Sequence, residues 1–342
     1  MTDQSLFDSE QAFHTAFVSG LEQLPAENEL GAFILVLANA SFDPAIFQVL
    51  SPALKRQFQA WQQQFLESPA AAGNFAADDV AVFEKLRSAG FEHLQTTRTR
   101  MEGIWQLQFN QLRSFRPPRN ADACFDTIKQ PFNPDGFHFN RPFLQKEMLW
   151  QGEWLGRSVK LLYNKFPFAP LHGLLVLDAE QNKPQYLDEN DHLFIWRWLE
   201  GLADDMPMGV AFNSLGAYSS VNHQHFQTFV SYRKLPVELG WWRHAGGNET
   251  YPLSCQRFIR SEDAWQVIER LHQANQPYNL LYRQGMMYCV VRRFQGSYAH
   301  ENWTGGFAWA ETMGAITLTG ECDFDQLTDS MIRSEMQKLF QP

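Results

Sequence analysis

The strongest indication of the fold lies in one stretch of the chain, FNSLGAYSSVNHQHFQ at residues 212–227. Its pattern predicts a strand over Val221–Tyr232, and on a strand alternate side chains share a face. We therefore expect His223, His225 and Gln227 on one face of a sheet. Two imidazoles and an amide are an unusual way to fill a core, because each buried polar group needs a partner.

Such a face suits phosphoryl transfer. A neutral imidazole, with a reference pKa of ~6.5, is a nucleophile near neutral pH and can form a covalent adduct that a second nucleophile resolves. The amide can donate to phosphate oxygens without adding negative charge, while Gly216 and nearby serines allow close approach of the backbone to an anion. A lone H-x-H pair is more often a metal site or a pair of core histidines, and both alternatives stay open. The small residues before the pair and the glutamine after it favour phosphoryl transfer.

Composition and charge narrow the class of protein. The chain has 342 residues, of which 44% are hydrophobic and 19% charged, so it has room for about two folded units. A formal net charge of −10 argues against nucleic acid or anionic membrane as a partner. No apolar run reaches the ~18 residues of a membrane span, and the N-terminus does not resemble a secretory signal. We expect a cytoplasmic protein.

The cysteines give no sign of a metal site or a disulfide framework. They are Cys124, Cys255, Cys289 and Cys322, and no C-x-x-C motif occurs. We expect reduced thiols, no zinc and no other cofactor.

One segment is locally basic. From Arg113 to Lys165 there are nine bases and five acids, which would suit a small anionic ligand such as a nucleotide. On charge alone, an ordinary solvated surface is the favoured interpretation.

The periodicity of apolar residues changes near residue 105. Before it, steps of three and four predict helices over 11–24, 45–66 and 78–94, with no catalytic constellation. After it, the patterns indicate a mixture of strands and helices. We expect strands over 105–109, 159–163, 173–177, 208–212, 278–283, 286–293 and 307–318, and helices over 188–202, 262–274 and 324–340.

The stretch at 212–227 resembles the active-site segment of the GDP-hexose phosphorylases. It is also similar to diadenosine-tetraphosphate phosphorylases and to galactose-1-phosphate uridylyltransferase, all in the H-x-H-x-Q transferase branch of the histidine-triad superfamily. Further similarity lies in LQFNQLR at 107–113, LYNKFPFAPLHGLLV at 162–176 and WAETMG at 309–314.

This resemblance implies an α+β, histidine-triad-like fold with antiparallel sheets. We expect a helical N-terminal region at 1–104, a catalytic half at 105–245 with the H-x-H-x-Q motif, and a second half at 246–342. The order of helices and strands in the second half loosely echoes that in the first.

The resemblance also implies roles for individual residues. His225 is the nucleophile, His223 orients it and Gln227 holds phosphate oxygens. His172 has a structural role only. The nucleotide and its phosphates are expected to contact Asn213, Ser220, Asn110, Arg113 and Asn164.

The implied activity is that of a nucleotidyltransferase of the phosphorylase type. It would act on a nucleoside-diphosphate sugar or a dinucleoside polyphosphate through a nucleotidyl-histidine intermediate, with phosphate as the second substrate. A hydrolase and a catalytically inactive nucleotide-binding protein are the alternatives, and a homodimer stays open. The paired zinc cysteines of the uridylyltransferase are missing, which weakens that comparison. The N-terminal helical block differs from the animal and plant phosphorylases, so the base and the sugar stay open.

Overall fold

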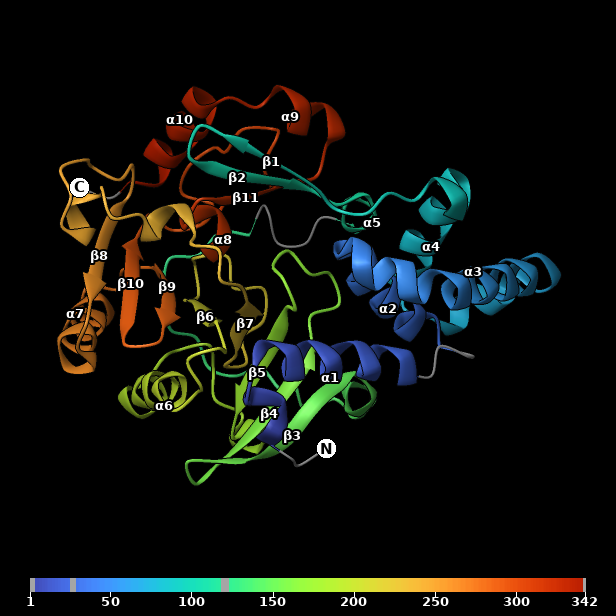
Figure 1. Ribbon diagram of the computed structural model, residues 1–342, viewed down its shortest axis with the longest axis horizontal. Coiled ribbons are helices and arrows are strands. Elements are labelled where there is room, and N and C mark those ends of the chain that lie inside the picture. The colour runs from blue at the N-terminus through green and yellow to red at the C-terminus, as the bar shows by residue number, and fades with distance from the viewer. Residues whose placement is uncertain (1–3, 25–28, 118–122, 341–342) are drawn as a thin grey trace.

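The computed structural model describes residues 4–24, 29–117 and 123–340, in which helices pack on two β-sheets (Figure 1). The larger sheet has the order β3-β4-β5-β7-β6-β9-β10-β8, and all its neighbouring strands are antiparallel. The smaller sheet has the order β1-β2-β11, with β11 parallel to β2. The predicted α+β class with antiparallel sheets is confirmed. The strands are β1 (Arg98–Glu102), β2 (Trp105–Phe109), β3 (Met148–Trp154), β4 (Arg157–Tyr163), β5 (Gly173–Leu177), β6 (Met208–Asn213), β7 (Phe226–Val230), β8 (Ser254–Phe258), β9 (Tyr278–Arg283), β10 (Met286–Val291) and β11 (Ala315–Leu318).

The helices fall into three groups along the chain. In Figure 1 the blue N-terminal helices lie beside the β3–β5 end of the large sheet, α6 and α7 lie near its other end, and α9 and α10 accompany the small sheet. None of the described helices is long and apolar enough to cross a membrane. Their bounds are α1 (Glu10–Gln23), α2 (Leu30–Phe42), α3 (Pro44–Glu67), α4 (Ala77–Ala89), α5 (Gln111–Ser114), α6 (Glu189–Glu200), α7 (Ser261–Gln273), α8 (Trp309–Thr312), α9 (Glu321–Gln326) and α10 (Asp329–Leu339).

The large sheet is buried on both faces, as its central strand β6 shows. Every residue of β6 is buried. Val210 and Phe212 pack in a core with the N-terminal helices, α6 and α7, whereas Ala211 faces a second core under β2, β11 and α8–α10. Alternate side chains of a strand point to opposite faces, so His225, Gln227 and Phe229 share the face of Ala211. The face that carries Gln227 is therefore the one that faces β2, β11 and α8–α10.

Most of the predicted elements are confirmed. The helices predicted over 11–24, 45–66, 188–202 and 262–274 match α1, α3, α6 and α7 to within two residues at each end, and the strands over 105–109 and 278–283 match β2 and β9. The strands predicted over 159–163 and 173–177 correspond to β4 and β5, which pair with each other. The boundaries between the three regions, at residues 104/105 and 245/246, stay a prediction.

The strand predicted over Val221–Tyr232 was wrong in its first five residues, because β7 begins only at Phe226. Two hydrogen bonds attach residues 221–225 to the loop before α6 instead of to a neighbouring strand. The Gln224 N–H donates to the Lys183 carbonyl, and Asn222 Oδ1 accepts from the Gln185 N–H. The two histidines therefore lie in a loop just before the sheet, with bends at Asn222 and His223.

Other differences have local causes. The expected strand over 307–318 is the short helix α8 followed by β11, because the Glu311 carboxylate accepts from the Ala308 N–H and caps the turn. The helix expected over 324–340 is divided into α9 and α10, with the Thr328 side chain capping the second. The helix predicted over 78–94 ends at Ala89, where Gly90 has φ of 84°. Helix α2 was not predicted, since burial on all sides leaves it without polar periodicity.

Candidate active site

Six of the eight predicted site residues line one cavity of about 580 Å³ on the face of the sheet that carries Gln227. They are His225, Gln227, Asn213, Ser220, Arg113 and Asn164. These residues come from β4, β6, β7 and the segments that follow or precede them, together with α5. The cavity, called the His225 cavity below, thus gathers side chains spread over more than a hundred residues of chain.

His225 is held in one tautomer. Its Nδ1 lies 2.9 Å from the His223 carbonyl oxygen, which can only accept, so Nδ1 carries the proton. Nε2 then has a free lone pair, and none of the described residues makes a recorded hydrogen bond to it. Burial lowers the pKa of His225 to about 4, so the ring is neutral near pH 7. A neutral, oriented imidazole in a cavity is chemically suited to nucleophilic attack.

His223 does not line the cavity. Its carbonyl oxygen accepts from Nδ1 of His225. Its Nδ1 accepts from the Phe139 N–H at 2.9 Å, and its Nε2 donates to the Ala179 carbonyl at 3.2 Å. Burial, and then the neighbouring His225, lower the pKa of His223 to about 4. The Phe139 ring packs on both imidazoles, with centroids 5.6 and 5.1 Å away. The two rings therefore lie on the same side, although no strand pairing places them there.

The side-chain amide of Gln227 has a fixed orientation. Its Oε1 accepts from the indole N–H of Trp309 at 2.8 Å and lies 3.1 Å from Nε2 of His172. Nδ1 of His172 accepts from the Phe168 N–H, so Nε2 carries the proton and donates to Gln227. With its oxygen used twice, the amide presents its NH₂ group to the cavity, where it can donate to an anion.

Burial and then the nearby Arg113 lower the pKa of His172 to about 3, which keeps this positioning group neutral. Sequence reasoning gave His172 no catalytic role, and its buried, fully bonded ring agrees with a supporting position. Trp309 belongs to the WAETMG block, and the resemblance implies no role for it. The sequence held no signal for its indole contact, which joins residues 82 positions apart.

Arg113 and Asn164 face the cavity from the side of the N-terminal helices. The Arg113 guanidinium donates to the Phe166 carbonyl and lies 4.7 Å above the Phe168 ring. Burial lowers the pKa of Arg113 to about 10, so it stays charged near neutral pH, close to the carboxylate of Glu311. Asn164 Oδ1 accepts from the Phe166 N–H. The half-buried Arg113 guanidinium brings positive charge to the cavity, where it can bind an anion.

Asn213 and Asn110 are used mainly by the protein itself. Asn213 lines the cavity, but its Oδ1 accepts from Asn279 Nδ2 at 2.7 Å and from the backbone N–H of Trp309 at 3.0 Å. Asn110 does not line it: Oδ1 caps α5 through the Arg113 N–H, and Nδ2 donates to Thr97. Asn110 therefore holds the backbone of Arg113 instead of facing the cavity. Ser220 lines the cavity and is exposed.

Part of the basic segment does reach the cavity, contrary to the expectation from charge alone. Arg113, Arg116 and Lys165 line it, whereas Arg119 lies outside the described residues. Lys165 pairs with Asp79 at the start of α4 at 2.7 Å. The N-terminal helices, in which no functional residues were predicted, thus supply a wall of the His225 cavity. Nearby Glu147 has its pKa raised by burial to about 7.

Two exposed aromatic rings, those of Phe137 and Phe143, also line the cavity. Phe137 and Phe143 are 49% and 55% exposed, although most large apolar side chains of this protein are buried. Both line the cavity together with Leu144 and Leu174. Exposed apolar rings beside polar donors are typical of a ligand site.

No metal centre is visible in the described part of the chain. It contains no group of three or more His, Cys, Asp or Glu side chains that could hold an ion. Of the cysteines, Cys289 is buried, Cys255 is half-buried and the other two are exposed.

Comparison with known sequences identifies related proteins over this region. Residues 99–229 match the family described as "GDPGP1-like, N-terminal domain". The predicted resemblance is confirmed. GDP-D-glucose phosphorylase 1 of Danio rerio is 33% identical over 115 residues, which is 33% of this chain and 32% of that protein. The protein of the same name from Homo sapiens is 31% identical over 144 residues, covering 40% of this chain and 36% of its own length. The match thus spans about a third of these relatives.

Solved structures share the fold over a longer stretch. The crystal structure of yeast Ap4A phosphorylase Apa2 covers 76% of this chain and 92% of its own, with a TM-score of 0.50 and 15% identity. The complex of that enzyme with Ap4A covers 78% and 99%, again with a TM-score of 0.50 and 15% identity. The histidine-triad-like fold expected from the sequence is confirmed.

Proposed function

We propose that this protein is a phosphorylase-type nucleotidyltransferase that acts on a GDP-hexose through a covalent nucleotidyl-His225 intermediate. The observation that carries the proposal is the tautomer of His225, whose protonated Nδ1 is bonded to the backbone while Nε2 is left for attack. The names of the curated relatives support a GDP-sugar as substrate. The family match, over residues 99–229, contains the whole H-x-H-x-Q motif.

The reaction proceeds in two steps. Nε2 of His225 attacks the α-phosphorus, an N–P bond forms, and the bond from that phosphorus to the bridging oxygen breaks. The hexose 1-phosphate leaves with the bridging oxygen and its electron pair. Orthophosphate then attacks the same phosphorus, the N–P bond breaks, and GDP is released. The two steps at one nucleophile predict ping-pong kinetics.

The residues around His225 suit the charge that develops on phosphorus. The Gln227 NH₂ group donates to a non-bridging oxygen, and the Arg113 guanidinium supplies positive charge nearby. Ser220 and Asn164 lie on the same cavity wall as hydrogen-bonding groups for phosphate and ribose. The exposed rings of Phe137 and Phe143 offer flat apolar surface to the base.

The dinucleoside polyphosphate Ap4A is the second candidate substrate, because the chain shares the fold of an Ap4A phosphorylase. The same attack at an α-phosphorus applies to it, with a different leaving group. Water in place of phosphate as the acceptor would make the protein a hydrolase.

The test is turnover of GDP-glucose and of Ap4A, each with and without orthophosphate. We expect phosphate-dependent formation of GDP and glucose 1-phosphate, and a labelled nucleotidyl adduct when phosphate is omitted. The adduct should be labile to acid and stable to base, as phosphoramidates are, and should map to His225. Release of nucleoside monophosphate at the same rate without phosphate would show a hydrolase, and failure of both substrates would contradict the proposal.

A further inference from the structure

The backbone of His225 lies beyond the last pairs of the sheet. The ladder between β5 and β7 ends at Leu175 and Phe226, and that between β6 and β7 ends at Ala211 and Gln227. The amide and carbonyl of the buried His225 therefore need partners from outside the strands, because buried backbone groups are costly when unpaired.

One side chain provides both partners. Oε1 of Gln185 accepts from the His225 N–H at 2.9 Å, and Nε2 of Gln185 donates to the His225 carbonyl at 3.1 Å. The same Nε2 donates to the Asn213 carbonyl at 2.9 Å. Gln185 is only 1% exposed and does not line the His225 cavity. It thus joins the end of β6 to the segment that enters β7, and it fixes the backbone from which the His225 ring projects.

Gln185 belongs to the segment 178–188, between β5 and α6, which we call the brace. The Ala179 carbonyl of the brace accepts the Nε2 proton of His223. The Gln185 N–H donates to Asn222, and the Gln224 N–H donates to Lys183. Four consecutive residues, from Asn222 to His225, are thus tied to the brace through hydrogen bonds.

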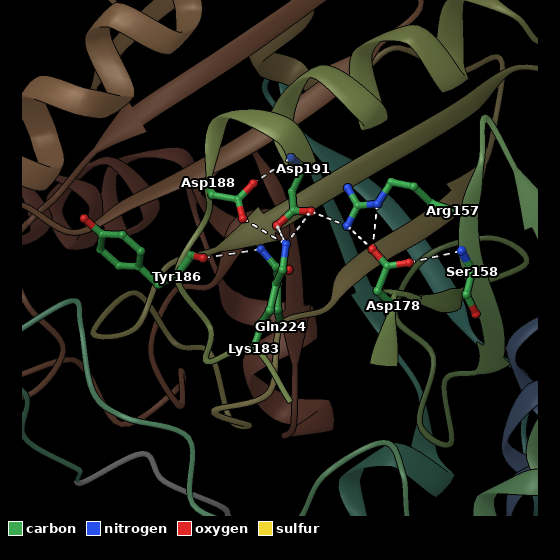
Figure 2. Close-up of polar contacts among 8 residues, drawn as sticks. All are labelled: Arg157, Ser158, Asp178, Lys183, Tyr186, Asp188, Asp191 and Gln224. Atoms are coloured by element: carbon green, nitrogen blue, oxygen red, sulfur yellow. Dashed lines mark hydrogen bonds and ion pairs between the residues drawn. The ribbon is translucent and has the colours of Figure 1, made fainter. Parts of the chain in front are cut away.

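The brace is fastened at both ends by a network of charges (Figure 2). Asp191, whose side chain has no exposure, lies between Arg157 at 2.6 Å and Lys183 at 3.0 Å. Arg157 also pairs with Asp178 at 2.6 Å, and Lys183 with Asp188 at 2.9 Å. Figure 2 further shows Gln224 reaching the backbone of Tyr186. The Asp191 carboxylate thus joins Arg157 of β4, which holds Asp178, to Lys183, which holds Asp188, so that both ends of the brace belong to one network.

We propose that the brace positions the reactive histidine, with Gln185 as the positioning residue that sets the place of the His225 ring relative to the substrate. The proposal rests on the function proposed above. An aligned nucleophile is worth a large rate factor, and a displacement near 1 Å can cost ~10²-fold. Loss of Gln185 should therefore slow the chemical step without weakening nucleotide binding.

The decisive variant is Gln185→Met, which keeps the length of the side chain and removes its three side-chain hydrogen bonds. The matched control is Gln181→Ala, an exposed glutamine of the same brace. Adduct formation is measured in a single turnover with whichever of GDP-glucose or Ap4A the wild-type protein uses, and binding with its α,β-methylene analogue. We expect adduct formation ~10–100-fold slower in Gln185→Met, with binding of the analogue unchanged within twofold and the control like wild type.

A merely structural role would lower the melting temperature but leave the rate per folded molecule unchanged, and that result would overturn the proposal. A second readout is the ¹⁵N spectrum of His225, which should show a single Nδ1-protonated tautomer in wild type and a mixture in Gln185→Met. If Gln185→Met does not fold, Lys183→Met decides, because Lys183 is partly exposed and fastens one end of the brace. Adduct formation at the wild-type rate in that variant would overturn the proposal. A wild-type protein that forms no adduct would instead contradict the proposed function.

Discussion

The large sheet contains β3–β7 from residues 148–230, called the first half here, and β8–β10 from residues 254–340, called the second half, and the two use polar residues in opposite ways. In the second half, Arg292 is fully buried and donates to the Phe307 carbonyl, to Asn279 Oδ1 and to the Tyr298 hydroxyl. In the first half, His225 Nε2 and the Gln227 NH₂ group face a cavity, and no described residue makes a recorded hydrogen bond to either. In the first half, His225 Nε2 and the Gln227 NH₂ group are thus available to a ligand. In the second half, the Arg292 guanidinium is bonded within the protein and supports the fold.

The halves are also connected at the site. Asn279 of β9 donates to Asn213 of β6, and Trp309 from the second half orients Gln227 in the first. The second half therefore acts as a support for the first, which explains why it needs no H-x-H-x-Q motif of its own. The predictions below test this division, beginning with the largest expected effect.

The first prediction separates the two halves by their histidines. His225→Ala should reduce turnover by about 10⁴-fold or more, because the attacking nitrogen is lost. Binding of the α,β-methylene analogue should persist. His272→Ala is the matched control, since His272 lies in the second half and bonds to the Tyr278 hydroxyl. Steady-state assays measure the turnover of both variants. A turnover of His225→Ala within tenfold of wild type would contradict the role of His225 as the attacking group.

The second prediction concerns the free amide of the first half. Gln227→Ala should lower kcat by ~10²–10³-fold, because one donor to the developing charge is lost. The KM should change much less. A mainly raised KM in the kinetic assay would show that Gln227 binds the ground state and does not act selectively on the transition state.

The third prediction addresses the satisfied cluster of the second half. Arg292→Met leaves buried acceptors without donors and should lower the free energy of unfolding by about 2–4 kcal/mol. Turnover per folded molecule should change by less than ~10-fold, since the guanidinium does not line the cavity. Urea unfolding and the activity assay measure the two effects. A large loss of kcat with unchanged stability would contradict the supporting role.

A fourth prediction sharpens the link between the halves. Trp309→Phe removes the indole donor to Gln227 and should lower kcat by about 3- to 10-fold, as expected for a neutral hydrogen bond of 0.5–1.5 kcal/mol. The effect should vanish in the background of Gln227→Ala, because the indole acts through that amide. A double-mutant cycle on kcat measures the coupling, and additive effects would refute it.

The smallest expected effect is that of acid on the chemical step. Burial lowers the pKa of His225 to about 4, so the ring is neutral at both pH 7 and pH 5.5. The rate of adduct formation at saturating substrate should therefore change by less than about twofold over this range. With an ordinary pKa of ~6.5, protonation would lower the rate by about tenfold at pH 5.5. A loss of that size would show that His225 titrates near its ordinary pKa in the enzyme–substrate complex.

Local patterns in the sequence determined the elements that have a polar and an apolar side or a clear turn. The hairpin of β9 and β10 follows from its Gln284-Gly285 turn, and the start of α4 from its acidic first turn. The H-x-H-x-Q spacing likewise placed His225 and Gln227 together, because such short-range order is encoded by neighbouring residues.

Only the tertiary structure decided how the site is completed. Gln185 and Trp309 lie 40 and 82 residues from the groups they hold, and nothing in their own neighbourhoods marks them. The start of β7, the wall supplied by α4 and the use of Asn110 as a cap depend on contacts between distant segments. Hydrogen-bond partners of this kind are chosen by packing in three dimensions, and periodicity along the chain carries no record of them.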